Sequence, residues 1–290
     1  MTAERVLLFT CQGLSLPGIL HPGAPDASRG VLVVVGGPQY RVGSHRQFVL
    51  LARELATAGV PVLRFDCRGM GDAEGEFPGF ENLDADLAAA IDAFFTQVPS
   101  LREVVIWGLC DAASAALFYA GSDARVRGLV LLNPWLRTEA GAARAYLRHY
   151  YLARLCNPEL WRKIRRGEFA FGAALRGLLD LIARAGRGGR ESARQTPVPT
   201  ASAAVAPAPL PERMAAGWQC FTGPILLILS GDDLTAAEFR DTARASRRWR
   251  HLLAEPRVTL RDYPEANHTF SRREWRDQVA AWTRDWLRAW

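Results

Sequence analysis

One stretch of this 290-residue sequence restricts its possible folds more than any other, because a strand pattern gives way to a helix pattern within three residues. The run from Val104 to Gly108 is apolar, as is typical of a buried strand. The alanine-rich series 112–120 follows it and predicts a helix. Cys110 lies in the middle of the turn that must join them. Small residues two positions before and after a nucleophile, at a strand-to-helix turn, are the pattern of a nucleophile elbow.

In such an elbow, Cys110 lies at the carboxyl end of a central strand and at a helix N-terminus, where the positive end of the helix favours a thiolate. Gly108 and Ala112 then have a steric role, because bulk at either position would clash with the neighbouring strand or helix. The alternative is a structural role, since an unpaired cysteine often behaves as a small buried apolar residue. The rest of the sequence has to decide between the two.

Strands and helices alternate on both sides of this turn. Ser44 and a capping box of Thr235 and Glu238 mark the expected starts of two helices. The alternation predicts an α/β fold with a mostly parallel central sheet and helices on both faces. After a hairpin at 4–20, the expected strands are 31–35, 60–65, 104–108, 126–132, 225–230 and 258–263, and the expected helices are 44–58, 82–97, 112–120, one from 235 and one from 271.

The alternation is interrupted after the strand that follows the elbow helix. Residues 136–185 have a helical pattern without a strand, and residues 186–217 are rich in Gly, Pro and Ala, which predicts a mobile linker. We therefore expect a core of residues 1–135 and 218–290, with a helical cap inserted over the carboxyl ends of the strands.

The cap carries an excess of positive charge. Residues 136–194 hold 13 Lys and Arg against five Asp and Glu. The excess of basic residues in this segment is therefore larger than the net charge of +6 of the whole chain. Such a segment can contact an acidic partner or an anionic membrane surface, or it can form a solvated arginine-rich face. No nucleic-acid-binding motif accompanies it, so we expect no nucleic-acid partner.

Cysteine usage and the missing motifs exclude several classes of protein. The cysteines are odd in number, irregularly spaced and without a CxxC pair, which favours a reduced, cytoplasmic setting. The N-terminal residues do not resemble a secretory signal, and no apolar run approaches the length of a membrane span. Gly69, Gly71 and Gly75 miss the dinucleotide-binding spacing by one residue, and no cluster has metal-ligand spacing, so we expect no cofactor and no metal. The five cysteines are Cys11, Cys67, Cys110, Cys156 and Cys220.

A cysteine nucleophile needs a base to take its proton, and the base needs a group that orients it. Of the five histidines, only His268 follows a predicted late strand at its carboxyl end. Asp232 and Asp233 follow the strand before it, so the order is nucleophile, acid, histidine. Spacing alone does not separate the two aspartates, and we favour Asp233.

Two backbone N–H groups are candidates for an oxyanion hole. One belongs to Asp111, directly after Cys110, and the other should come from the glycine-containing loop after strand 31–35. Pro38 has no N–H, so Gln39 is the expected donor from this loop. The alternative is that the loop is a plain turn.

These motifs resemble the α/β-hydrolase superfamily. More closely, they resemble the exosortase A system-associated hydrolases (type 1) of exopolysaccharide-producing bacteria. The similarity covers residues 1–135 and 218–290, and it implies an α/β-hydrolase fold, a Cys110–Asp233–His268 triad, a bacterial cytoplasmic location and a link to exopolysaccharide or exosortase systems. It implies no known substrate. The motifs are the Gly-Leu-Cys-Asp-Ala elbow, Phe65–Asp72, Gly231–Ala236 and the pair Asn267 and His268.

The sequence leaves two hypotheses for function. In the first, Cys110 attacks a small-molecule acyl ester or thioester, and water or a sugar hydroxyl accepts the acyl group. Cysteine in place of the commoner serine favours thioester or dienelactone hydrolase-like chemistry over a simple serine esterase. In the second, the protein is a catalytically idle scaffold that docks on a membrane-bound polysaccharide assembly through its basic cap.

Overall fold

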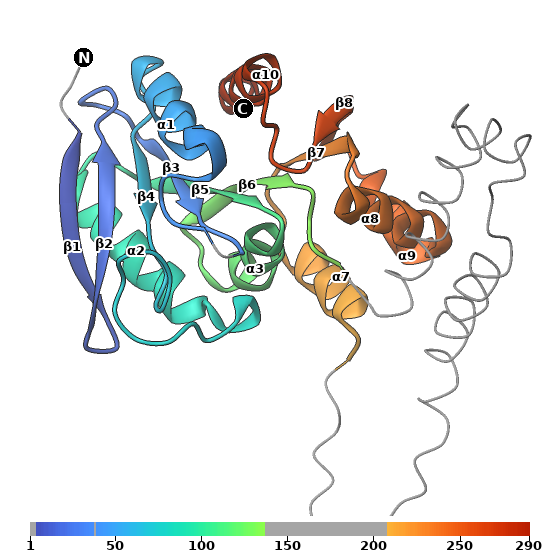
Figure 1. Ribbon diagram of the computed structural model, residues 1–290, viewed down its shortest axis with the longest axis horizontal. Coiled ribbons are helices and arrows are strands. Elements are labelled where there is room, and N and C mark those ends of the chain that lie inside the picture. Colours follow the sequence, from blue (N-terminus) through green and yellow to red (C-terminus); the bar gives the residue numbers. More distant parts are fainter. Residues whose placement is uncertain (1–3, 38, 137–207) are drawn as a thin grey trace, which may run out of the picture.

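The computed structural model describes residues 4–37, 39–136 and 208–290, and its centre is one sheet of eight strands (Figure 1). The strand order is β1-β2-β4-β3-β5-β6-β7-β8. The pairs β1–β2 and β2–β4 are antiparallel, and every later pair is parallel. The predicted mostly parallel α/β sheet is therefore confirmed. The strands are β1 (Arg5–Cys11), β2 (Leu14–His21), β3 (Arg29–Val34), β4 (Val62–Phe65), β5 (Glu103–Leu109), β6 (Val126–Leu132), β7 (Ile225–Asp232) and β8 (Val258–Asn267).

Helices cover both faces of this sheet (Figure 1). On one face α1 (Gln47–Thr57) packs beside α10 (Arg273–Leu287), the last helix of the chain. The other face carries α2, α3, α7, α8 and α9, with α3 packed between α2 and α7. Their bounds are α2 Asp84–Gln97, α3 Asp111–Tyr119, α7 Leu210–Cys220, α8 Leu234–Ala245 and α9 Arg247–Leu253.

The two helix layers explain the continuous apolar runs of the central strands. From Val104 to Leu109 every residue of β5 is buried, and β3 and β6 are nearly as enclosed. A strand covered on both faces has no side that can remain polar, so its sequence does not alternate. The edge strand β1 shows the opposite case, because Val6 and Leu8 stay exposed on its outer side.

The first helix begins later than predicted. Ser44 opens a single 3₁₀ turn, Ser44–Arg46, and α1 starts only at Gln47. His45 and Arg46 have φ values of 54° and 59°, which an α-helix cannot contain. The prediction that Ser44 caps this helix is therefore wrong.

The predicted linker 186–217 extends too far towards the C-terminus. Its last residues form the start of α7, in which Met214 and Trp218 are fully buried. Proline is tolerated in the first turn of a helix, and Pro211 occupies that place here, so the proline content of the segment concealed the helix. Residues 137–207, and with them almost all of the predicted cap, lie outside the described residues. Among the helices that are described, none has the length and apolar character needed to cross a membrane.

Candidate active site

The turn between β5 and α3 has the geometry of a nucleophile elbow. Cys110 has φ 63° and ψ −125°, a region that residues with a side chain rarely occupy and that stores roughly 1–3 kcal/mol of strain. Its N–H donates to the carbonyl of Leu132 at 2.9 Å, and its carbonyl accepts from the N–H of Trp135 at 3.1 Å. The end of β6 and the residues after it therefore bind both the N–H and the carbonyl of the strained residue.

The small residues of the elbow have the steric role that the sequence indicates. A Cβ atom added to Gly108 would lie 2.7 Å from the backbone carbon of Ala112 and 2.8 Å from its oxygen. These are backbone atoms of α3, so they cannot move aside as a flexible side chain would. Ala112 itself is completely buried against the strand.

The loop after β3 lies directly against the elbow. The N–H of Gly37 donates to Asp111 Oδ2 at 3.0 Å, and Asp111 Oδ1 accepts from the N–H of Ala112, also at 3.0 Å. A Cβ atom on Gly36 would lie 2.2 Å from the Asp111 carboxylate. Burial raises the pKa of the Asp111 carboxyl, although these N–H groups favour its charged form. The Asp111 side chain thus joins the loop to the elbow, a role that the sequence did not indicate.

His268 and Asp233 lie together at the carboxyl end of the sheet. His268 Nδ1 is 2.9 Å from Asp233 Oδ2, and the Asp233 side chain is only 6% exposed. Asp232 is exposed and pairs in register with Asn267 of β8. The structure therefore brings Asp233, and not its neighbour, against the imidazole.

Cys110 also acts on the imidazole, because its interaction with the ring is one of the causes that raise the pKa of His268. Because Nδ1 faces Asp233, Nε2 is the nitrogen left for the sulfur. Burial of the ring opposes its positive charge, but the hydrogen bond and the charge of Asp233, together with the interaction with Cys110, outweigh burial and raise the pKa of His268 to about 10. An imidazolium next to a sulfur atom is the arrangement that activates a cysteine.

Asp233 has a second role at the start of α8. It is the N-cap residue, and its carboxylate accepts from the N–H groups of Thr235 at 3.0 Å and Ala236 at 3.1 Å. The predicted capping box of Thr235 and Glu238 is therefore wrong, because the helix begins one residue earlier at Leu234. A capping carboxylate is held in one orientation, which also fixes the oxygen that faces His268.

Gln39 does not point its N–H towards the elbow in this structure. That N–H donates to the carbonyl of Gly37 at 2.8 Å, and the Gln39 side chain accepts from the N–H of Ser44. The N–H that the sequence predicts as an oxyanion-hole donor therefore bonds the carbonyl of Gly37 instead.

The other cysteines and the metal-binding residue types form no second site in the part of the chain that the structure describes. Cys11 and Cys67 are buried, Cys220 is exposed, and none of them forms a disulfide. Burial raises the pKa of the Cys67 thiol well above its usual range. No three His, Cys, Asp or Glu side chains in the described ranges converge as metal ligands.

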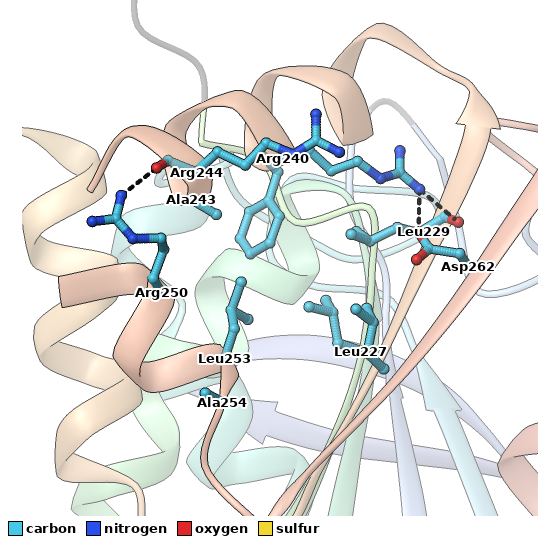
Figure 2. Close-up of a pocket in the computed structure, with 11 residues that line it drawn as sticks. Leu227, Leu229, Arg240, Ala243, Arg244, Arg250, Leu253, Ala254 and Asp262 are labelled. Atoms are coloured by element: carbon cyan, nitrogen blue, oxygen red, sulfur yellow. Dashed lines mark hydrogen bonds and ion pairs between the residues drawn. The ribbon is translucent and has the colours of Figure 1, made fainter. Parts of the chain in front are cut away.

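A hollow of about 450 Å³ lies apart from these residues, between the sheet and helices α8 and α9 (Figure 2). Its walls are mostly apolar, and none of Cys110, Asp233 and His268 lines it. Arg240 crosses one wall, where its guanidinium donates to the carbonyls of Leu229 and Ser230 and pairs with Asp262. This arginine therefore binds the carboxyl end of β7, next to the segment that leads to Asp233.

Comparison with known proteins identifies the same fold. The model of the alpha/beta hydrolase family matches residues 19–282. An esterase from Pyrococcus furiosus superposes with a TM-score of 0.64 at 15% identity, covering 99% of this chain and 93% of that chain. A serine hydrolase without lid from Xanthomonas campestris gives 0.56 at 17% identity, covering 100% and 98%. A thermophilic esterase from Thermogutta terrifontis gives 0.54 at 19% identity, covering 98% of each chain. A search of curated proteins found no significant match.

Proposed function

The chain belongs to the alpha/beta hydrolase family, and from this premise we propose that it hydrolyses carboxylic esters or thioesters with Cys110 as the nucleophile. The observation that carries the proposal is the environment of His268, whose Nδ1 contacts Asp233 and whose pKa is raised by its interactions with both Asp233 and Cys110. An imidazole held between a carboxylate and a thiol can move a proton to and from the reacting sulfur. Two structurally similar proteins are described as esterases, which agrees with this reaction class.

The proposed reaction has two steps. The Cys110 sulfur attacks the carbonyl carbon, a tetrahedral oxyanion forms, and the leaving alkoxide or thiolate takes a proton from His268. Water then attacks the acyl-cysteine and gives a proton to His268, and collapse of the tetrahedral intermediate breaks the carbon–sulfur bond, releases the acid and regenerates the Cys110 thiolate beside the imidazolium. A sugar hydroxyl could replace water in the second step, in which case the acyl group is transferred.

The oxyanion needs N–H donors that reach it. The N–H of Asp111, directly after the nucleophile, is the first of these in the proposal. Gln39 is the second, and its N–H must leave the Gly37 carbonyl before it can bind the oxyanion. The proposal therefore includes the loss of the hydrogen bond between Gln39 and Gly37 when a substrate binds.

The wider setting is also part of the proposal. The motifs that resemble exosortase A system-associated hydrolases support a role in the bacterial cytoplasm, next to exopolysaccharide or exosortase systems. The acyl group would then come from a small molecule or a saccharide of that system. Deletion of the gene should change the acylation of the secreted polysaccharide, and mass spectrometry of the polysaccharide tests this setting directly.

A panel of acyl esters and acyl thioesters tests the chemistry. We expect turnover that Cys110→Ala abolishes and that Cys220→Ala leaves unchanged, because Cys220 is exposed and lies beside Gly121, after the C-terminal end of α3, whereas Cys110 precedes its N-terminal end. Mass spectrometry should detect an acyl group on Cys110 during turnover. If no substrate turns over and no acyl group is trapped, the idle scaffold is the better description.

A further inference from the structure

Asn133 is a fully buried polar residue that directly follows β6, and the reaction above does not use it. Its φ of 43° lies in the left-handed region, which asparagine tolerates better than most residues. A buried amide must find partners for both of its hydrogens and for its oxygen. The residues that satisfy it therefore show what it holds together.

The partners of this amide belong to the two segments that carry the acid and the base. Nδ2 donates to Ser230 Oγ at 2.8 Å and to the backbone carbonyl of His268 at 3.1 Å. Oδ1 accepts from the N–H of Ser230 at 2.9 Å. All three hydrogen-bonding positions are used, so the amide is fixed in one orientation.

The hydrogen bonds of Asn133 lie where the regular pairing of β7 and β8 is interrupted. The pairing of β7 and β8 shifts register between Ser230 and Asp232, so regular strand bonds do not fix the spacing of the two segments there. A Cβ atom on Gly231 would lie 2.1 Å from the Pro264 carbonyl oxygen, which shows how closely the backbones of β7 and β8 approach each other. Arg240 of α8 also donates to the Ser230 carbonyl at 2.9 Å.

We propose that Asn133 is a positioning residue, whose amide sets the place of His268 relative to Asp233 and to the Cys110 sulfur. Ser230 lies three residues before Asp233, so a bond to Ser230 fixes the segment that leads to the acid. A bond to the His268 carbonyl fixes the backbone from which the imidazole projects. The role rests on the proposed function, but it predicts a property of His268 that can be measured without substrate.

The test is the variant Asn133→Gly. Glycine adopts a φ of 43° without strain, so this change removes the amide and spares the backbone. We expect the imidazole pKa of His268, followed by NMR titration, to fall from about 10 towards 6.5 by at least about one unit. The rate of Cys110 alkylation by iodoacetamide at pH 7 should fall several-fold.

A matched control separates positioning from a general loss of stability. Thr283→Ala also removes a fully buried polar contact, the bond from Thr283 Oγ1 to the Val279 carbonyl, but within α10. It should lower the melting temperature and leave the His268 titration unchanged. If Asn133→Gly does not fold, Ser230→Ala replaces it, because it takes one acceptor from the amide and keeps the Ser230 N–H. It should shift the titration in the same direction by a smaller amount.

An unchanged His268 titration in the folded variant would overturn the positioning role. A shift in Asn133→Gly that Thr283→Ala reproduces would overturn it as well. The proposed function fails in a different way, by slow alkylation of Cys110 in the unaltered protein and no turnover. In that case the His268 titration still decides whether Asn133 positions the ring.

Discussion

Asp233 Oδ2 lies 2.9 Å from His268 Nδ1, and the same oxygen accepts from the N–H of Ala236 in the first turn of α8. One carboxylate therefore orients the imidazole and caps a helix. The two roles have different chemical requirements, because a cap needs only a side-chain oxygen, whereas the imidazolium also needs a negative charge.

The first prediction separates these two roles. In a His268→Gln background, which has no charged ring to stabilise, Asp233→Asn should keep the free energy of unfolding within about 0.5 kcal/mol because asparagine caps helices as well as aspartate. With His268 in place, Asp233→Asn should lower the pKa of His268 and reduce turnover strongly, because the charge is lost. Asp233→Ala should cost about 1 kcal/mol of stability in addition. Urea unfolding and NMR titration measure the two effects, and Asp232→Asn, at the exposed neighbour, should change neither.

The second prediction concerns the reactivity of the thiols. Cys110 should react with iodoacetamide faster than Cys220, although Cys220 is exposed, because only Cys110 has an imidazolium partner. The buried Cys11 and Cys67 should react more slowly still. Peptide mapping after a brief treatment identifies the labelled positions.

The control for this prediction is His268→Ala, which should reduce the labelling of Cys110 and leave that of Cys220 unchanged. Equal labelling of Cys110 and Cys220, or no effect of the histidine substitution, would mean that Cys110 is an ordinary thiol. The proposed nucleophile would then be wrong, whatever the fold.

The elbow and the sheet could be predicted because their signals are local in the sequence. Steric needs around Cys110 specify small residues at fixed offsets, and enclosure of β5 on both faces makes it apolar throughout. The placement of an acid and a histidine after consecutive strands follows from the parallel sheet, since the carboxyl ends of its strands meet at one edge.

The features that the sequence did not reveal depend on contacts between distant segments. Asn133 reads as a turn residue before a proline, and only the folded chain shows its bonds to Ser230 and His268. Arg46 has an ordinary helix propensity, yet the packing of the loop gives it a positive φ. Asp233 and Thr235 were equally good caps by residue type, and the place where β7 ends decided between them.

The third prediction tests the steric limit at the elbow. Gly108→Ala should destabilise the protein by about 1–3 kcal/mol and reduce the reactivity of Cys110, because the new methyl group meets the backbone of Ala112. Gly121→Ala is the matched control, since its nearest neighbour is the Cβ of Cys220 at 3.0 Å and it lies outside the site. A Gly108→Ala variant with unchanged stability would contradict the close approach of strand and helix.

The last prediction concerns the stability of the protein at alkaline pH. The pKa of His268 is about 10 in the folded state, whereas a histidine without these partners has a pKa of about 6.5. The folded state therefore binds the proton more tightly than the unfolded state does. The stabilisation from the charged ring is therefore complete below pH 6.5 and is lost as the pH rises towards 10. Relative to His268→Gln, the free energy of unfolding should fall across this interval.

Two references make this measurement specific. Urea unfolding at pH 6, 8 and 10 in both proteins gives a difference from which the titration of all other groups largely cancels. Cys110→Ala should reduce the dependence on pH, because the interaction of Cys110 with the imidazole raises the pKa of His268. A difference that stays constant from pH 6 to 10 would show that the ring is not held as an imidazolium, and the pairing of His268 with Cys110 and Asp233 could not then activate the sulfur.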